Sequence, residues 1–218
     1  MNLDDLLSVE RFLRQRLTEP LPGAPVQLRF APRPARKGWE PDQQPEGARQ
    51  AAALILLYEA EGGLILPLTV RRDDLPHHPG QVSLPGGAVD PGEPPIRAAL
   101  REAHEEIGVA PDDVRILGSL STLNVIVSNF VVRPFVGVAG HRPDFRLAPE
   151  EVAALVEVPL EEVRDAGRLG WSRRVRDGFL VTYPHFDLAG HHVWGATAMI
   201  LGEFASLFDP EFAPPPFE

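Results

Sequence analysis

Three glutamates in the middle of the chain have the spacing of a shared metal site. Glu102, Glu105 and Glu106 stand at positions i, i+3 and i+4, so a helix would place them on one face. Three carboxylates at short range repel one another unless a positive charge lies among them. Carboxylate oxygens are hard ligands, which favour Mg²⁺ or Mn²⁺ over zinc. The spacing therefore predicts a divalent-cation site, and the alternative is a solvated acidic helix face.

The helix that would carry these glutamates is well marked. Pro94 and Pro95 suit a first helical turn, where a missing N–H costs nothing, and Gly108 is a typical C-terminal stop. Apolar residues gather on one side of this helix, at Ile96, Ala99, Leu100, Ala103 and Ile107. The preceding loop is rich in Gly and Pro, which lets backbone carbonyls approach a metal closely. We expect the apolar side to pack on a sheet while the acids face a cleft.

Further residues stand at set offsets around the glutamates. The full pattern is Gly87-x5-Glu93-x7-Arg101-Glu102-Ala103-x-Glu105-Glu106-x-Gly108-Val109. It resembles the Nudix box at every specified position. The resemblance implies an enzyme that hydrolyses nucleoside diphosphates linked to another group, using Mg²⁺ or Mn²⁺. It also implies an α/β fold, the Nudix-type α/β/α sandwich around a mixed β-sheet. By the same resemblance, Glu102, Glu105 and Glu106 are metal ligands together with the Gly86 carbonyl, and Glu93 pairs with Arg101.

The segment just before the box resembles one branch of this family, the coenzyme A pyrophosphatases. The matching positions are Leu68, Thr69, Arg71, His78, Gly80, Pro85, Gly86 and Gly87. This resemblance implies hydrolysis of coenzyme A or acyl-coenzyme A to 3′,5′-ADP and 4′-phosphopantetheine or its acyl form. It makes Arg71, His78, Gly80, Pro85 and Gly87 the candidate substrate-binding residues. Arg71 suits a phosphate because a guanidinium can bind two phosphate oxygens at once.

Three positions depart from that branch. Arg72 replaces a usual Ser or Ala, Pro76 stands where an Arg is expected, and Leu84 replaces Phe. The lost arginine matters because the 3′-phosphate of coenzyme A needs cationic partners. Either Arg72 compensates or the substrate differs, and the alternatives are ADP-ribose, a dinucleotide or a nucleoside triphosphate. A non-catalytic nucleotide-binding module is a further alternative, although such modules generally lose box glutamates.

A fourth acid, Glu151, is a candidate member of the catalytic group. It precedes Val152 as in the coenzyme A branch, where a distant glutamate often completes the metal cluster. The resemblance thus gives Glu102, Glu105, Glu106 and Glu151 as catalytic candidates, with the general base among them. The alternative is an acid at a helix start, where the helix dipole favours negative charge.

Composition limits the class of protein. The chain has 218 residues, no cysteine and a net charge of −10, which argues against disulfides and against a nucleic-acid surface. A nucleotide-type small molecule remains compatible, because a metal supplies local positive charge. No apolar run approaches the ~18 residues that span a bilayer, and the first residues lack the order of a signal peptide. We therefore expect a cytoplasmic protein that does not bind membranes or nucleic-acid polymers.

The predicted organisation has three parts: an N-terminal helix and proline-rich connector (1–48), a hydrolase domain (49–208) and a C-terminal tail (209–218). Residues 3–17 are predicted as an amphipathic helix, which favours a docking or homodimer contact over a membrane anchor. Within the domain, we expect hairpins at 51–71, 171–183 and 185–194, strands at 114–122 and 130–140, and a helix at 195–208. Residues 26–30 are predicted as a short strand, and 149–157 and 159–166 as helical or mixed segments. His191 and His192 are interpreted as ordinary hairpin residues.

Overall fold

A mixed sheet forms the centre of the molecule. The computed structural model describes residues 5–35, 38–74, 80–176 and 178–217. The strands of this sheet are β1 (Arg49–Ala60), β2 (Gly63–Arg71), β3 (Val82–Ser83), β4 (Gly86–Ala88), β5 (Val114–Ser119), β6 (Leu123–Val125), β7 (Phe130–Ala139) and β8 (Val152–Pro159). The order is β3-β2-β1-β7-β5, and β4 pairs with β1, β6 with β7 and β8 with β2. The β1–β7 pair is parallel, whereas the other pairs are antiparallel.

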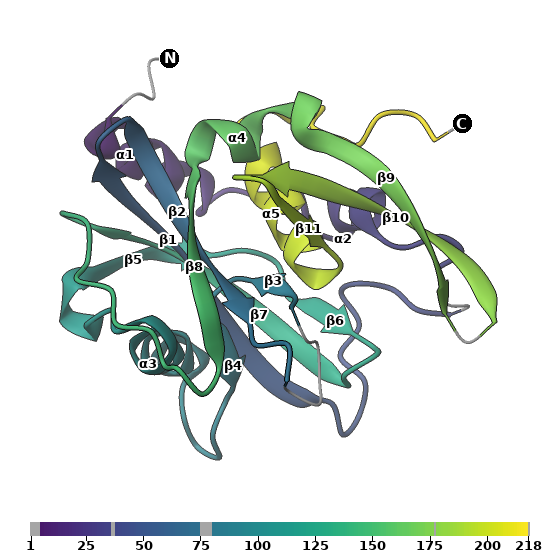
Figure 1. Ribbon diagram of the computed structural model, residues 1–218, viewed down its shortest axis with the longest axis horizontal. Coiled ribbons are helices and arrows are strands. Elements are labelled where there is room, and N and C mark those ends of the chain that lie inside the picture. The colour runs from purple at the N-terminus through teal and green to yellow at the C-terminus, as the bar shows by residue number, and fades with distance from the viewer. Residues whose placement is uncertain (1–4, 36–37, 75–79, 177, 218) are drawn as a thin grey trace.

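Both faces of the sheet are covered, which β1 shows most clearly. Ala53, Ile55 and Leu57 belong to one hydrophobic cluster, with side chains from α1 (Leu6–Arg16), α2 (Gly23–Gln27) and α5 (Ala196–Ser206). The residues between them on β1 belong to a second cluster, with α3 (Pro95–Ile107). Because side chains alternate along a strand, the two clusters lie on opposite faces. Figure 1 shows α3 on one side of the sheet and α1 and α5 on the other. The predicted α/β/α sandwich is confirmed.

The helix α3 matches its prediction closely. Pro94 is its N-cap and Pro95 its first residue, and Gly108 ends it in the left-handed conformation at φ 77°. A residue with a side chain would be strained at that φ, which explains the glycine. The predicted apolar side is packed, since Ala99, Leu100, Ala103 and Ile107 are buried and Ile96 lies against the same cluster. The β1–β2 hairpin before it and the strands β5 and β7 after it are also confirmed.

A second, smaller sheet consists of β9 (Leu169–Arg176), β10 (Phe179–Leu188) and β11 (His191–Trp194). Both predicted hairpins are present. Asp177, at the predicted turn of the first, lies outside the described residues. The second turns at Ala189 and Gly190, both with positive φ (46° and 78°), as a tight two-residue hairpin turn requires. The final predicted helix is confirmed as α5, and no helix within 5–35, 38–74, 80–176 or 178–217 is long and apolar enough to cross a membrane.

The predicted short strand at 26–30 is wrong. These residues form the end of α2 and a 3-10 turn, η1 (Leu28–Phe30). Val26 and Phe30 are both buried, and their i, i+4 spacing suits one helical face better than strand alternation. Gln27 between them donates a hydrogen bond to buried Glu203 of α5 at 2.8 Å. The N-terminal helix is confirmed as α1, with Leu6, Val9 and Leu13 buried against the sheet.

The helical or mixed prediction for 149–157 is also wrong over most of its length. Residues from Val152 onward form β8, which pairs with β2 from Ile65↔Pro159 to Arg71↔Val152. Val152, Val156 and Val158 are buried, which fits a strand packed on one face. The pairing with β2 overrides the helical propensity of the alanines and glutamates. The segment 159–166 does contain a short helix, α4 (Leu160–Arg164), followed by η3 (Ala166–Arg168), and η2 (Pro111–Asp113) precedes β5.

Candidate active site

The loop that begins the box is held against the central strand. The backbone N–H of Leu54 on β1 donates to the carbonyl of Pro85 at 2.9 Å, and β4 then pairs with β1 through Gly86 and Gly87. A Cβ on Gly86 would clash with the carbonyl oxygen of Ala52 and lie 2.7 Å from the Cα of Ala53. Only glycine allows this approach, which is why the loop can lie flat on β1 beside α3.

Two of the box glutamates reach from α3 back to this loop. A Cβ on Gly87 would lie 2.5 Å from the carboxylate carbon of Glu102, so that carboxylate occupies the space of the absent side chain. One turn later, Glu106 accepts a hydrogen bond from the backbone N–H of Gly86 at 3.2 Å. Glu106 is 8% exposed. The i, i+4 spacing therefore places both carboxylates against the loop.

Glu105 is placed differently from its two neighbours. Its side chain is 56% exposed, whereas that of Glu102 is 17% exposed. Arg101 joins the two, because its Nη1 donates to Glu102 at 2.8 Å and to Glu105 at 2.9 Å. The sequence predicted three carboxylates on one face. Packing against β4 separates them into two at the loop and one toward solvent.

Arg101 also forms the ion pair that the family resemblance implied. Its Nε and Nη2 donate to the two carboxylate oxygens of Glu93 at 3.1 and 3.0 Å. Nη2 additionally donates to the carbonyl of Ala88 at 3.0 Å. These hydrogen bonds lower the pKa of Glu93 and raise that of Arg101. The guanidinium therefore ties the loop to the helix and orients Glu102 and Glu105 at the same time.

The electrostatics of the cluster resist ionisation in the absence of a cation. Burial raises the pKa of Glu106 to about 8, opposed by the Gly86 N–H and reinforced by the charges of Glu102 and Glu151. Burial likewise raises the pKa of Glu102, opposed by Arg101 and reinforced by Glu105 and Glu151. Carboxylates that repel each other in a desolvated pocket are a suitable environment for a divalent ion.

Glu151 and Arg71 reach this cluster from the neighbouring strands. Arg71 ends β2 and pairs with Val152, the first residue of β8, so Glu151 stands immediately before β8 and beside Arg71. The Arg71 Nη1 lies 3.7 Å from a carboxylate oxygen of Glu151. Both side chains act on Glu106, whose pKa Arg71 lowers and Glu151 raises. The structure thus brings together a cation and a carboxylate that are 80 positions apart in the chain.

The remaining candidates lie on the segment between β2 and β4. Gly80 has φ 64°, and its N–H donates to the Arg71 carbonyl at 3.2 Å. Leu84, a departure from the branch pattern, is 6% exposed. It belongs to the hydrophobic cluster that packs between the sheet and α1, α2 and α5, called the main hydrophobic cluster below. Arg72 is bound to Asp74 through two hydrogen bonds and to the Pro149 carbonyl. His78 and Pro76 lie outside the described residues.

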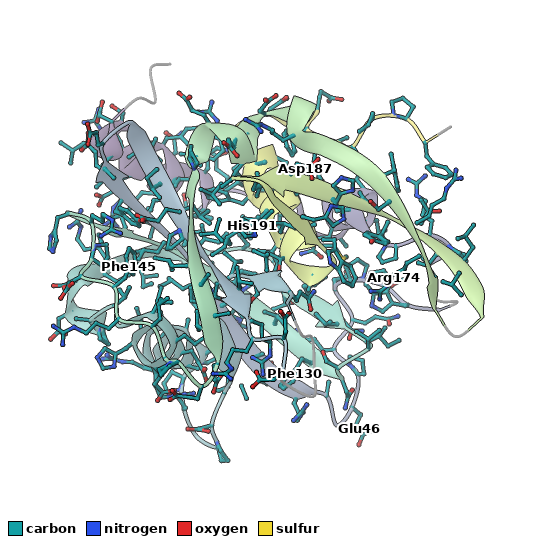
Figure 2. All side chains as sticks on the ribbon, in the orientation of Figure 1. Glu46, Phe130, Phe145, Arg174, Asp187 and His191 are labelled. Atoms are coloured by element: carbon teal, nitrogen blue, oxygen red, sulfur yellow. The ribbon has the colours of Figure 1, made fainter. Side chains whose placement is uncertain are left out.

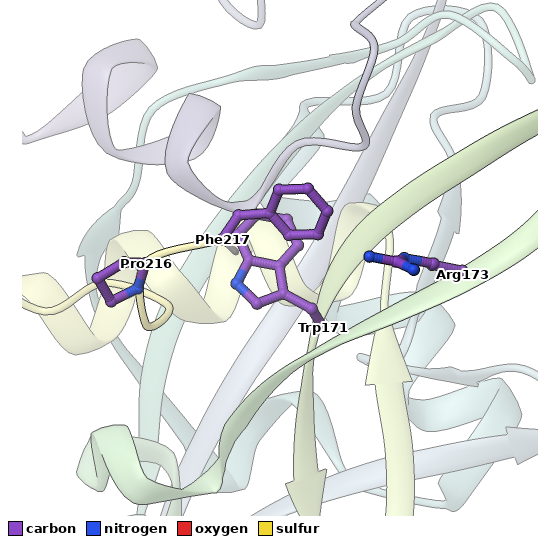
Figure 3. Close-up of a pocket in the computed structure, with 4 residues that line it drawn as sticks. All are labelled: Trp171, Arg173, Pro216 and Phe217. Carbon is purple, nitrogen blue, oxygen red and sulfur yellow. The ribbon is translucent and has the colours of Figure 1, made fainter.

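The chemistry of the donor set fits a hard cation. Every candidate ligand at the box is an oxygen: α3 supplies the three carboxylates and β4 the Gly86 carbonyl. Within the described part of the chain, the one compact group of three possible metal ligands is elsewhere, at His185, Asp187 and His192. The box glutamates are more widely spaced, with Arg101 between two of them. A surface pocket on β9 and the C-terminal segment is lined by Trp171, Arg173, Pro216 and Phe217; it holds no carboxylate (Figure 3).

Comparison with known proteins identifies the family. The family model of the NUDIX domain matches residues 48–177. The chain is 42% identical over 166 residues to a protein of Enterobacter sp. (strain 638) named "Uncharacterized Nudix hydrolase NudL", covering 72% of this chain and 81% of that one. A protein of the same name from Klebsiella pneumoniae (strain 342) is 35% identical and covers 94% of each chain. These names state no substrate.

Solved structures agree on the fold. A Nudix hydrolase from M. smegmatis, RenU, matches with a TM-score of 0.54 and 20% identity, covering 78% of this chain and 90% of that one. The MutT protein from Methanosarcina mazei Go1 matches with a TM-score of 0.50 and 18% identity, covering 77% and 100%. Nudix hydrolases generally use divalent metal ions and bind nucleotide-type substrates. The chain belongs to the Nudix family and is a hydrolase of diphosphate anhydrides.

Proposed function

We propose that this Nudix hydrolase cleaves coenzyme A or acyl-coenzyme A to 3′,5′-ADP and 4′-phosphopantetheine or its acyl form. The observation that carries the proposal is the resemblance of residues 68–87 to the coenzyme A pyrophosphatase branch. The placement of Arg71 beside Glu151 supports it, because a guanidinium at the edge of the carboxylate cluster suits a diphosphate. The segments 117–137 and 193–201 resemble the same branch.

The proposal includes Mg²⁺ or Mn²⁺ held by Glu102, Glu105 and Glu106 with the Gly86 carbonyl. The donor set supports hard cations, since it offers only oxygens. When bound, such an ion would offset the charge of the diphosphate and make a water molecule more acidic. The Glu105 side chain is hydrogen-bonded to Arg101 and exposed, so it would rotate toward Glu102 and Glu106 to reach the ion.

The protein's own residues would accept the proton, bind the phosphates and position the loop. Glu106 or Glu151 takes a proton from the attacking water, and both stand in the same electrostatic cluster. Arg71 binds the phosphate oxygens. Arg101 keeps the loop and helix in register through Glu93, and Gly80, Pro85 and Gly87 shape the backbone on which the substrate lies. His78 remains a candidate substrate contact by resemblance alone.

Support for other substrates comes from the positions that depart from the coenzyme A branch. Leu84 is a core residue, so its change from Phe alters packing and does not by itself indicate another substrate. Arg72 is held by Asp74, which reduces its freedom to replace the arginine expected at position 76. ADP-ribose, a dinucleotide or a nucleoside triphosphate therefore remain the alternatives. All box glutamates are present, which disfavours a non-catalytic module.

A substrate panel with Mg²⁺ tests the proposal. Coenzyme A, 3′-dephospho-coenzyme A, acetyl-coenzyme A, ADP-ribose and ATP are compared by chromatography of products, with Glu106→Gln as the inactive control. We expect coenzyme A or its acyl form to give the highest kcat/KM, with 3′,5′-ADP as product, and a fall of about 10²–10⁴ in the Glu106→Gln variant. A clear preference for ADP-ribose would contradict the coenzyme A assignment and leave the family unaffected.

The Arg71→Ala variant refines the same experiment. If Arg71 binds the 3′-phosphate, its loss raises KM for coenzyme A and leaves KM for 3′-dephospho-coenzyme A unchanged. If Arg71 binds the diphosphate, its loss raises KM equally for both substrates. Its position beside Glu151 and its lowering of the pKa of Glu106 favour the diphosphate.

Three further expectations belong to the proposal. We propose residues 49–208 as the hydrolase domain, with 1–48 and 209–218 as additions to it. A cytoplasmic location is expected, and a homodimer through the N-terminal helix is the alternative to a monomer. Leu7 on α1 is 70% exposed, so the Leu7→Glu variant is the natural probe of such a contact. Sedimentation of both proteins tests it, and cell fractionation tests the location.

A further inference from the structure

A cluster of two histidines and one aspartate lies on the small sheet. His185 and Asp187 stand two positions apart on β10, so they share a face, and Asp187 pairs across the strands with His192 on β11. Their neighbours on the other face, Phe186 and Val193, are fully buried in the main hydrophobic cluster. The three polar side chains therefore point away from the core. Figure 2 shows Asp187 and the adjacent His191 on this hairpin, well separated from α3.

The distances within this cluster suit a single bound ion. The Nε2 of His185 lies 3.6 Å from one oxygen of Asp187, and the Nδ1 of His192 lies 3.6 Å from the other. One ligand atom from each residue lies within 4.8 Å of the other two. In a tetrahedral site with bonds of about 2.0–2.2 Å, ligand atoms are about 3.3–3.6 Å apart. Small side-chain rotations would bring all three to one ion.

The neighbouring strand positions the buried histidine. Gly170 on β9 stands opposite His185, and a Cβ there would lie 2.9 Å from the Cε1 and Nε2 of the imidazole. Glycine therefore makes room for the ring. The hydroxyl of Ser172, two residues further along β9, lies 3.3 Å from the Nδ1 of His185. A proton on Nδ1 donated to this hydroxyl leaves the lone pair of Nε2 facing Asp187, the arrangement that metal-binding histidines use.

We propose that His185, Asp187 and His192 bind a divalent transition-metal ion of the zinc class, at a site separate from the box glutamates. Two imidazoles and one carboxylate favour Zn²⁺, Co²⁺, Ni²⁺ or Cu²⁺ over Mg²⁺ and Ca²⁺. The side chain of His185 is 10% exposed, whereas those of His192 and Asp187 are 40% and 64% exposed. An ion would thus enter from solvent, link β10 to β11 and keep an open coordination position.

The sequence contained part of the signal for this site. The predicted turn at 189–190 already implies that residue 187 faces residue 192. His191 and His192 are adjacent in the sequence, but successive residues of a strand point to opposite faces, so only His192 lies on the face of Asp187. His191 shares its face with Val193, away from the cluster. It is therefore the matched control for the neighbouring ligand.

Zinc titration of the EDTA-treated full-length protein tests the proposal. Isothermal titration calorimetry is run on the wild type and on Asp187→Asn, His192→Ala and His191→Ala, each also in the Glu106→Gln background to remove zinc binding at the box. We expect one equivalent of Zn²⁺ to bind wild type and His191→Ala alike. Asp187→Asn and His192→Ala should weaken this binding by at least about 10–100-fold. The same two variants should lose the visible absorption of bound Co²⁺ and the rise in melting temperature with Zn²⁺.

The opposite results overturn the proposal. Equal zinc affinity in wild type, Asp187→Asn and His192→Ala would show that the three side chains are a polar surface cluster that does not bind the metal. Loss of binding in His191→Ala would place the zinc elsewhere on the hairpin. Asp187→Asn is nearly isosteric at an exposed position, so it remains informative even if His192→Ala fails to fold. Circular dichroism and melting in EDTA establish the fold of each variant.

Discussion

Gly87 and Glu102 are in such close contact that the carboxylate of Glu102 fills the place where a Gly87 side chain would be. A Cβ on Gly87 would lie 2.5 Å from the Cδ and Oε2 of Glu102 and 2.7 Å from its Oε1. The backbone of β4 and the helix α3 are thus fitted to each other at the carboxylate that the proposal assigns to the metal. The position of the Glu102 carboxylate therefore depends on the absence of a side chain at Gly87.

The Gly87→Ala variant should therefore lose activity by displacing Glu102. No positive φ constrains Gly87, so the effect is steric. A shift of about 1 Å in a ligand can cost about 10²-fold in rate, and we expect a loss of this size in kcat. The control is Gly92→Ala in the same loop, where φ is 82° and no atom lies within 4 Å of an added Cβ. That variant should lose about 1 kcal/mol of stability through backbone strain and keep its kcat. Equal rates for wild type and Gly87→Ala would contradict this account.

The stability of the metal-free protein should fall as pH rises through the titration of Glu106. The folded protein raises the pKa of this carboxyl from 4.5 to about 8, chiefly by burial. The folded state then holds the proton more tightly than the unfolded state, so the contribution is complete below about pH 4.5 and is lost as pH rises through about 8. A shift of this size corresponds to a loss on the order of 5 kcal/mol.

The measurement is urea unfolding in EDTA at about pH 5.5 and about pH 8.5. The wild type should lose more stability between these pH values than Glu106→Gln, whose amide does not titrate. Comparing the two proteins cancels the other groups that titrate in this range. Identical pH dependence in both would refute the buried, proton-binding state of Glu106.

Glu151 and Glu150 offer a matched pair of adjacent acids. Glu151 stands beside Arg71 and raises the pKa of Glu106 and Glu102. Glu150 acts on Arg72, outside the carboxylate cluster. Glu151→Gln should lower kcat by about 10²–10³ if Glu151 serves as base or ligand, whereas Glu150→Gln should leave kcat unchanged. Equal effects of the two changes in steady-state assays would remove Glu151 from the catalytic group.

Glu93→Gln tests the link between loop and helix. One of the two hydrogen-bonded oxygens becomes an amide, so the bidentate contact with Arg101 is lost. Because the pair is partly exposed, we expect a small fall in melting temperature and a larger fall in kcat, as Arg101 also orients Glu102 and Glu105. Since Arg101 lowers the pKa of Glu93, the stabilisation is present at neutral pH and is lost as pH falls below about 4.5. An unchanged kcat would rule out the positioning role.

The sequence predicted those features that neighbouring residues decide. The helix α3 follows from its prolines, its apolar stripe and Gly108, and the hairpin of β10 and β11 follows from Ala189 and Gly190. The strand β8 was missed because its pairing with β2 is a long-range contact that local propensity does not reveal. The helix α2 was missed for a similar reason. Its Gln27 is fixed by Glu203, 176 positions away.

In the candidate site, too, local spacing was predictable from the sequence, whereas long-range contacts were not. The spacing of the box glutamates was enough to place them on α3. It did not distinguish Glu105 from Glu102 and Glu106, because the difference arises from packing of the helix against Gly86 and Gly87. The closeness of Arg71 to Glu151 depends on the register between β2 and β8. The resemblance to the family pattern identified the candidate residues, whereas the pairing of the strands determines how far apart Arg71 and Glu151 lie.

Removal and return of the metal test the central claim most directly. The wild-type protein is treated with EDTA, dialysed and assayed with coenzyme A by chromatography of 3′,5′-ADP, first without added metal and then with Mg²⁺, Mn²⁺ or Zn²⁺. Because all proposed ligands at the box are oxygens, we predict no turnover without metal, recovery with Mg²⁺ or Mn²⁺, and poor recovery with Zn²⁺. An EDTA-treated sample that hydrolyses its substrate at the original rate would contradict the assignment of residues 87–109 as a metal-dependent catalytic box.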